Sequence, residues 1–133
     1  MTDILTPPKI QENPKGKKER KEKLDKYEDS TGKIYDILIG VSDQNNWDII
    51  TNASQNDLWF HVDDQPSCHV IIKTNNEKKI EKRVIMHAAL MCKMNSKAKH
   101  QKNTKIIYTH IKNVTKGDTV GSVITSKTLV VTV

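Results

Sequence analysis

The sequence is poor in the residues that build large cores and covalent frameworks. Aromatic residues make up only 5% of the 133 residues, and there are two cysteines. The core must therefore rest on Ile, Val, Leu and Met. Two cysteines in a chain of this length do not form a disulfide framework, which favours a reducing compartment.

Long apolar runs are also missing. No run approaches the ~18 residues that a transmembrane helix needs, and the beginning of the chain lacks the charged-then-apolar pattern of a secretory signal. We therefore predict an intracellular, cytoplasmic protein without a membrane segment. The length argues for a single folded domain.

Acidic residues are absent from a long stretch of the second half. Residues 77–133 contain twelve Lys or Arg against three Asp or Glu, whereas residues 34–76 contain one against six. No acidic residue lies between Glu81 and Asp118, but nine basic residues do: Lys82, Arg83, Lys93, Lys97, Lys99, Lys102, Lys105, Lys112 and Lys116. A solvated surface usually mixes both signs, so this stretch predicts a polyanionic partner. Lysine binds phosphate as a point charge, which favours attraction to a nucleic-acid backbone over base readout.

Signatures of catalysis are missing as well. The sequence has no Gly-x-Ser-x-Gly elbow, no phosphate-binding loop and no catalytic cysteine signature. Five residues are candidate metal ligands by type: His61, Cys68, His69, His87 and Cys92. Neighbouring strand residues point to opposite faces, and a spacing of five fits one helix face poorly, so the set does not resemble a zinc site. We predict no catalytic residues, no metal and no cofactor, and hence a protein that is not an enzyme.

Hydrophobic periodicity predicts an α+β fold. Strands are expected at residues 34–40, 105–110, 120–124 and 128–133, with a short helix up to about residue 54 and a long helix over 78–97. These elements favour a mixed or antiparallel sheet with both helices packed on it. Residues 1–30 have mixed charge and no apolar face, which predicts a disordered lysine-rich arm, with a nascent helix near 18–27, before a domain over 31–133.

The most informative motif consists of two short apolar runs, each with one histidine. The first is Asp57-Leu58-Trp59-Phe60-His61-Val62, and the second is Pro66-Ser67-Cys68-His69-Val70-Ile71-Ile72. Alternation places Leu58, Phe60 and Val62 on one strand face and Trp59 and His61 on the other. The polar residues between the runs predict a tight connection between paired strands.

This motif resembles the Asp-Leu-Trp-Phe-His … Pro-Gly-Ser-His-Val-Ile-Ile signature of the NFACT RNA-binding domain family. Further matches follow in the order of that family from about Tyr35 to Val133: Gln44-Asn45, Lys93-Met94-Asn95-Ser96, Tyr108-Thr109, Lys112-Asn113-Val114, Gly117, Gly121-Ser122-Val123 and Lys127-Thr128-Leu129-Val130-Val131-Thr132. Two departures stand out. Ser67-Cys68 replaces Gly-Ser in a turn that prefers glycine, and Val41 replaces a basic residue of the longer relatives.

The resemblance implies binding of structured RNA, such as tRNA or ribosomal RNA, in translation or ribosome-associated quality control. It implies that RNA and the ribosome are the partners, although the lysines by themselves are also compatible with binding to DNA. The N-terminal domain and coiled-coil arms of the large relatives have no counterpart in this sequence, so activities of those parts are not implied for it; a partner protein that supplies them is a further candidate. Two other classes remain as alternatives, a protein-binding adaptor and a small metal-dependent hydrolase.

The candidate RNA-binding residues are concentrated at the end of the long predicted helix and in the loop after it. We predict that Lys93, Lys97, Lys99, Lys102 and Lys105 line one continuous positive surface, because loops on a rigid scaffold often carry binding sites. The wider predicted set adds Asn95, Lys112, Lys116, His61 and His69. Each histidine is either a hydrogen-bonded partner within the fold or a phosphate contact at the rim of the strand pair. Trp59 and Tyr108 are either core residues or platforms for stacked bases.

Overall fold

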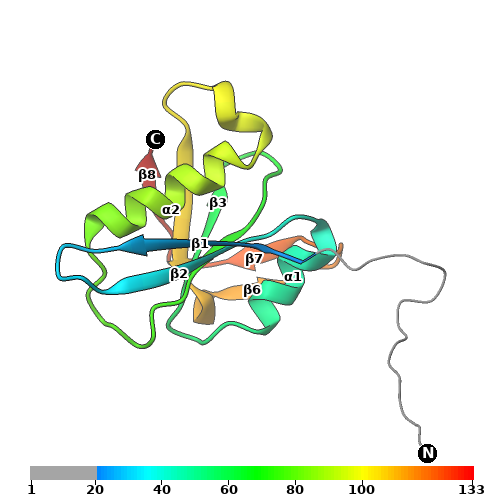
Figure 1. Cartoon of the computed structure of the whole chain (residues 1–133). Helices are drawn as coiled ribbons and strands as arrows, with labels where there is room; N and C mark the ends of the chain where they lie inside the picture. The colour runs from blue at the N-terminus through cyan, green and yellow to red at the C-terminus, as the bar shows by residue number, and fades with distance from the viewer. Residues whose placement is uncertain (1–20) are drawn as a thin grey trace, which may run out of the picture.

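The computed structural model describes residues 21–133, which fold around a six-stranded sheet (Figure 1). The sheet has the strand order β1-β2-β4-β3-β5-β8, and every pair of neighbouring strands is antiparallel. Its strands are β1 (Lys23–Glu28), β2 (Ile34–Ile39), β3 (Leu58–Val62), β4 (Val70–Ile72), β5 (Lys105–His110) and β8 (Leu129–Thr132). A separate small sheet pairs β6 (Val114–Lys116) with β7 (Val123–Thr125). The predicted α+β class and the antiparallel sheet are confirmed.

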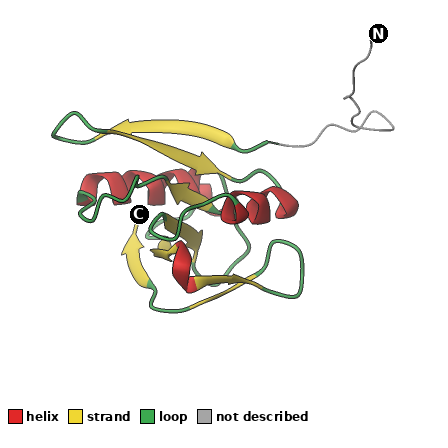
Figure 2. Ribbon diagram, turned by 90° about the horizontal axis from the view of Figure 1, so that it is seen from below, coloured by secondary structure: helices red, strands yellow, loops and turns green. Residues whose placement is uncertain are grey.

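Two α-helices and two short 3-10 helices complete the described fold. They are α1 (Asp43–Thr51), α2 (Lys82–Met94), η3 (Lys97–His100) and η4 (Ile111–Asn113). Figure 1 shows α2 lying across the large sheet, and Figure 2 shows the β1–β2 hairpin along one edge of the molecule. None of the helices within residues 21–133 combines the length and the apolar character required to cross a membrane.

The alternation in β3 divides the core into two layers. Leu58, Phe60 and Val62 face α2 and pack with its apolar stripe, which includes Val84 and Ala88. Trp59 belongs to the other cluster, which contains Ile49 and Ile50 of α1 and the buried Ile71 and Ile111. Because both faces of β3 are covered, the strand reads as a nearly continuous apolar run in the sequence.

Helix ends differ from the predicted bounds for identifiable reasons. Ser42 caps α1, because its Oγ accepts the backbone N–H of Asn45 at 3.1 Å. The long predicted helix is shorter than expected, since α2 ends at Met94 and Ser96 caps the separate turn η3. The strand expected at 120–124 is displaced to Val123–Thr125, because Gly121 lies in a turn with φ of 91°.

The predicted boundary at residue 31 requires a correction. Residues 1–20 of the expected arm lie outside the described residues, but residues 23–28 form β1, which pairs with β2 along its whole length. Within the described part of the range 18–27, the structure therefore has a strand where a helix was expected. The inner face of β1 is held by polar and aromatic contacts: Asp25 contacts His87 Nε2 at 2.7 Å, and the Tyr27 ring stacks on His87. Because polar and aromatic contacts hold this face, the sequence of β1 shows no alternation of apolar and polar residues.

Candidate nucleic-acid interface

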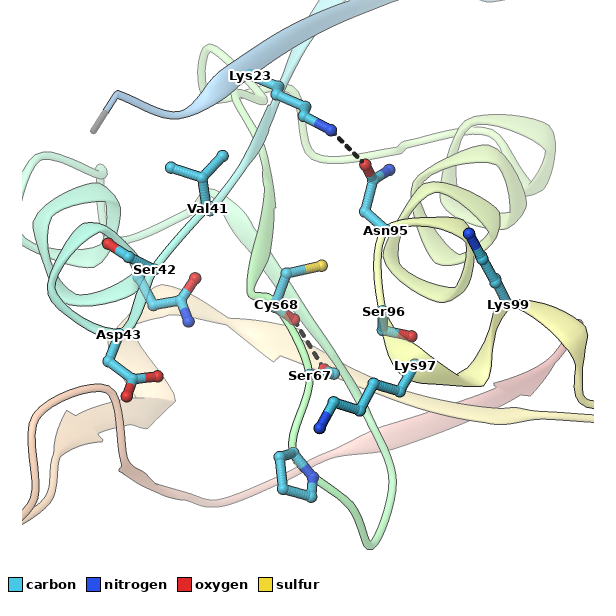
Figure 3. Close-up of a pocket in the computed structure, with 13 residues that line it drawn as sticks. Lys23, Val41, Ser42, Asp43, Ser67, Cys68, Asn95, Ser96, Lys97 and Lys99 are labelled. Atoms are coloured by element: carbon cyan, nitrogen blue, oxygen red, sulfur yellow. Dashed lines mark hydrogen bonds between the residues drawn. The ribbon is translucent and has the colours of Figure 1, made fainter.

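A cleft of about 730 Å³ opens where three segments meet, the start of α1, the loop between β3 and β4, and the junction of α2 with η3 (Figure 3). Its walls also include Lys23 from β1. We call this the cationic cleft, and its lining residues are Lys23, Gly40, Val41, Ser42, Asp43, Asn46, Pro66, Ser67, Cys68, Asn95, Ser96, Lys97 and Lys99.

The α1 side of the cationic cleft is fixed by the side chain of Asn46. Its Oδ1 accepts the backbone N–H of His69 at 3.1 Å, and the N–H of Gly40 donates to the His69 carbonyl at 2.9 Å. A Cβ on residue 40 would lie 1.9 Å from Asn46 Oδ1, so only glycine fits there without displacing Asn46. These contacts join the end of β2, the start of α1 and the segment before β4.

The loop between β3 and β4 is closed by the Ser67 hydroxyl. It accepts the backbone N–H of Val62 at 3.0 Å and donates to the carbonyl of Cys68 at 2.8 Å. The positive φ in this loop falls on Asp64, at 63°, and not on Ser67. The serine that stands where the family signature has glycine is therefore accommodated without left-handed backbone strain.

The opposite wall is formed by the break between α2 and η3. Ser96 Oγ donates to the carbonyl of Lys93 at 2.8 Å and accepts the N–H of Ala98 at 3.2 Å. This double contact turns the chain, so that Lys97 and Lys99 emerge as exposed residues on the cleft wall. Asn95 Oδ1 accepts from the Lys23 ammonium at 3.0 Å (Figure 3), which connects this wall to β1.

The electrostatics of the cleft are dominated by the unpaired lysines. Three lysines line it against one carboxylate, that of Asp43. Within residues 21–133, no carboxylate lies within ion-pair distance of Lys97 or Lys99. Two exposed ammonium groups thus lie at the cleft without a neutralising carboxylate among residues 21–133, which is the arrangement that attracts an anionic backbone.

The remaining predicted lysines fall into two groups. Lys102 is exposed in the loop after η3, and Lys105 is exposed at the first residue of β5; neither lines the cleft. The Lys93 ammonium donates to the Val133 carbonyl at 3.2 Å. Lys112 and Lys116 lie beyond the other end of β5. The Lys116 ammonium contacts Thr51 Oγ1, at the last residue of α1, and lies 5.4 Å from the Trp47 ring centroid. The structure therefore brings Lys97 and Lys99 together at the cleft and places Lys112 and Lys116 beyond the other end of β5.

A second cleft, of about 520 Å³, adjoins the first and contains both predicted histidines. We call it the histidine pocket; it shares Asp43, Asn46, Pro66 and Ser67 with the cationic cleft and is otherwise lined by Trp59, His61, Gln65, His69, Ile107, Thr119, Val120, Gly121, Ser122, Val123 and Thr125. The two clefts lie on either side of the Pro66-Ser67 segment.

His69 is a hydrogen-bonded member of the core. Its side chain is only 2% exposed, and Nδ1 accepts the Trp59 Nε1–H at 3.0 Å. Burial and, to a smaller extent, the charge of His61 lower the pKa of His69 to about 3, and a hydrogen bond with the Gly121 backbone opposes the shift. The imidazole is therefore neutral at physiological pH.

His61 is half-buried and stacks on Trp59, with ring centroids 5.7 Å apart. Burial lowers its pKa, so it too is neutral near pH 7. Nδ1 lies 2.6 Å from the Val62 carbonyl oxygen and must carry the proton, because a carbonyl only accepts. Nε2 then presents a lone pair, which accepts hydrogen bonds from amino or hydroxyl groups but offers none to a phosphate oxygen.

The two aromatic residues that the sequence singled out, and the carboxylate of Asp57, have structural positions. Trp59 is 1% exposed and packs with the isoleucines of α1, so it is no surface platform for a base. Tyr108 stacks on Phe60 with centroids 5.3 Å apart. Asp57 is buried, accepts the backbone N–H groups of Ser54 and Thr74 at 2.9 Å each, and pairs with Lys73 at 2.8 Å. In the described part of the chain, no three His, Cys, Asp or Glu residues come together as a metal site.

Several cleft residues were not in the predicted set, notably Lys23, Ser42 and the 66–68 segment. Lys23 was hidden because β1 shows little apolar alternation, with Leu24 exposed on the outer face. Ser42 caps α1 and Ser67 lies in the β3–β4 loop, and no sequence signal shows that these two segments meet. Whether these segments come together depends on how the strands of the sheet pair.

Comparison with known proteins assigns the chain to a family. The model of the NFACT protein RNA binding domain matches residues 23–131. The chain belongs to this family. It is 33% identical over 110 residues to the Rqc2 homolog RqcH of Bacillus subtilis (strain 168), a match that covers 82% of this chain and 18% of the relative.

Two further similarities agree with this assignment. Coiled-coil domain-containing protein 25 of Bos taurus is 35% identical over 86 residues, covering 62% of this chain and 41% of that protein. The structure of the C-terminal part of the fibronectin/fibrinogen-binding protein of Streptococcus suis superposes with a TM-score of 0.76 at 26% identity, covering 90% of this chain and 48% of that one. The NFACT RNA-binding domain thus spans less than half the length of these relatives.

Proposed function

We propose that this NFACT RNA-binding domain binds RNA through the cationic cleft and acts as a binding module, not an enzyme. The observation that carries the proposal is the pair of exposed lysines on η3, Lys97 and Lys99, which line the cleft without a carboxylate partner within residues 21–133. The family assignment supplies RNA as the polyanion.

The chemistry of the cleft favours contact with the sugar–phosphate backbone. Lys97 and Lys99 neutralise phosphate charge, and the Asn95 amide and the Ser42 and Ser96 hydroxyls supply further polar groups close by. Lys102 and Lys105 extend the positive surface along the loop into β5. Because lysines act as point charges, the interface follows the shape of the RNA and shows low sequence specificity.

A structured RNA, tRNA or ribosomal RNA, is the substrate class that we propose. The cleft walls are rigid, since hydrogen bonds close the β3–β4 loop and the α2–η3 break, so they suit a backbone whose path is already fixed. The setting that we propose, translation or ribosome-associated quality control, rests on the family and on the similarity to RqcH.

The proposal is tested by titrating the full chain with tRNA over a salt series. We expect the logarithm of the binding constant to fall linearly with the logarithm of salt concentration, with a slope of about −0.7 to −0.9 for each phosphate neutralised. A DNA duplex of matched length in parallel shows whether the 2′-hydroxyls matter. No affinity at low salt, or an affinity that ignores salt, would contradict the proposal.

A companion experiment separates RNA binding from a protein-binding adaptor. The chain is used as bait in a lysate with and without ribonuclease. RNA binding predicts that ribosomal material is lost from the captured fraction after nuclease treatment. Partners that persist unchanged would favour the adaptor instead.

A further inference from the structure

The two cysteines of the chain face each other at the wall of the cationic cleft. Cys68 lies in the segment before β4, and Cys92 lies in the last turn of α2. Each sulfur is 3.6 Å from the backbone carbonyl oxygen of the other cysteine, and Ser67 Oγ is 3.9 Å from Cys92 Sγ. Both thiols are free, and a hydrogen bond joins them.

The two thiols differ in exposure and acidity. Cys68 is partly exposed and lines the cleft, whereas Cys92 is buried (Figure 3 shows Cys68). The hydrogen bond from Cys92 lowers the pKa of Cys68, burial opposes this shift, and the positive charge of Lys23 adds to it. The same hydrogen bond and burial raise the pKa of Cys92. An accessible, acidified thiol beside a buried neutral one matches the division between an attacking and a resolving cysteine.

One member of this cysteine pair departs from the family signature. Cys68 stands where the family signature has serine, so the dithiol is a departure from the pattern that defines the fold. Its position connects the two walls of the cleft, since Cys68 follows Pro66 and Ser67 while Cys92 precedes Asn95 and Ser96 by only a few residues.

We propose that Cys68 and Cys92 are a peroxide-oxidisable dithiol whose disulfide form weakens RNA binding in the cationic cleft. The effect on RNA rests on the proposed function, whereas the oxidation does not. Hydrogen peroxide, or an organic hydroperoxide, is the oxidant.

The reaction balances in two steps. The Cys68 thiolate attacks one peroxide oxygen, the O–O bond breaks, and Cys68 becomes a sulfenic acid while the leaving hydroxide takes up a proton as water. The Cys92 thiol then attacks the Cys68 sulfur, the S–O bond breaks, and the second water leaves with the thiol proton. Two thiols lose two electrons, and one hydrogen peroxide gains them to give two waters. A cellular dithiol reductant reverses the change.

The disulfide is expected to act on the cleft by linking the segments that form its two walls. A disulfide would hold the two sulfurs about 2.05 Å apart and so tie the segment before β4 directly to the last turn of α2. The hydroxyl contacts of Ser67 and the turn at Ser96 sit on these same segments. The cleft between Ser67 and Lys97 is therefore narrower in the oxidised protein, and we expect RNA affinity to fall by about fivefold or more, the low end of typical coupling between two sites.

The test oxidises the reduced full chain with a small excess of hydrogen peroxide, blocks the remaining thiols and measures the mass. We expect a monomer that has lost two hydrogens, a peptide pair linked through Cys68 and Cys92, and complete reversal by dithiothreitol. Retention of both free thiols in the folded chain, under conditions that oxidise the urea-unfolded chain, would overturn the proposal. Disulfides formed only between chains would overturn it too.

Matched variants assign the roles of the two sulfurs. In Cys92→Ser, we expect a Cys68 sulfenic acid that a dimedone probe traps. In Cys68→Ser, we expect no trapped sulfenic acid, because Cys92 is buried. Equal trapping in both variants would contradict the assignment of Cys68 as the attacking thiol. If a variant does not fold, the linked-peptide map of the unmodified chain still decides whether the pair forms.

RNA titrations of the reduced and oxidised forms complete the test. A disulfide that forms and leaves tRNA affinity unchanged would overturn the coupling to the cleft. If the reduced chain binds no RNA, the proposed function fails together with the coupling, while the mass measurement still decides the dithiol chemistry. The Cys68→Ser variant cannot form the disulfide, so its affinity is expected to be the same before and after peroxide treatment, whatever its value in the untreated variant.

Discussion

The cationic cleft and the histidine pocket lie on either side of the same Pro66-Ser67 segment, yet they differ in chemistry. The cleft carries the exposed ammonium groups of Lys97 and Lys99, which have no carboxylate partner among residues 21–133. The pocket carries two imidazoles that burial keeps neutral. We propose that the cleft attracts a polyanion from solution, whereas the pocket lies between the large sheet, α1 and the small sheet.

The difference shows that polar residue types do not identify a binding site by themselves. His69 and Lys97 were both candidate RNA contacts in the sequence, but His69 satisfies Trp59 inside the core while Lys97 stands on an exposed turn. The position of each residue relative to the sheet decides its role. The following variants test whether binding and stability separate along this division.

The largest effect is expected from removing both cleft lysines. The double variant Lys97→Ala/Lys99→Ala should bind tRNA about thirtyfold more weakly in ~0.1 M salt, because each lost phosphate contact removes its share of counterion release. Its melting temperature should stay close to that of the unmodified chain, since exposed charges contribute little to stability. Fluorescence anisotropy and a thermal melt check both statements. An unchanged affinity for tRNA would contradict the assignment of RNA binding to the cleft.

The pH dependence of stability should reveal the buried His69. Its folded pKa of about 3 is below the unfolded value of 6.5, so the unfolded chain binds more protons between these values. The contribution of His69 is complete above pH 6.5 and is lost as the pH falls toward 3, by up to about 1.4 kcal/mol for each pH unit.

Urea denaturation at pH 7, 6 and 5 measures this slope. The His69→Gln variant is the control, because it removes the titrating group and leaves the carboxylates and His61 in place. We expect it to be less stable at pH 7 and to lose less stability on acidification. Equal slopes in the two proteins would show that His69 is not the group responsible.

A smaller effect is expected for His61→Ala. The half-buried imidazole donates to the Val62 carbonyl and stacks on Trp59, so its loss should lower the free energy of unfolding by about 1 kcal/mol. RNA affinity should change by less than twofold. The Nε2 atom of neutral His61 carries a lone pair and no proton, so it donates no hydrogen bond to phosphate. A variant that melts normally but binds RNA poorly would move His61 into the binding site.

The smallest effect is expected from the lysines at the far end of β5. The double variant Lys112→Ala/Lys116→Ala removes as much charge as the cleft variant, but at the opposite end of α1 and β5. RNA affinity should fall by about twofold or less, and stability should fall by about 0.5–1 kcal/mol through loss of the cation–π contact with Trp47. A loss equal to that of the cleft variant would mean that overall charge, and not position, governs binding.

The sequence predicted the fold class and the paired histidine strands because their signals are local. Alternation in residues 57–62 placed Trp59 and Phe60 on opposite faces, and the structure confirms this. β1 was missed because its inner face rests on the contacts of Asp25 and Tyr27 with His87, 60 or more residues away. Such pairings leave no periodic trace.

The candidate site was predictable only in part for the same reason. Lys97, Lys99 and Asn95 were expected together, since they are close in the sequence. Lys23 and Ser67 reach the same cleft through strand pairing and a loop. The division of the lysines between the two ends of β5 likewise depends on the strand between them, which a count of charges does not show.

The most direct test of the cationic cleft is an NMR titration of the uniformly ¹⁵N-labelled chain with tRNA fragments at low salt. We predict that the largest amide shifts occur at residues 67–68 and 95–99 on the two walls of the cleft, while the amides of residues 112–116 change little. Shifts concentrated at residues 112–116, or spread evenly over all lysine-bearing segments, would contradict the assignment of RNA binding to the cleft.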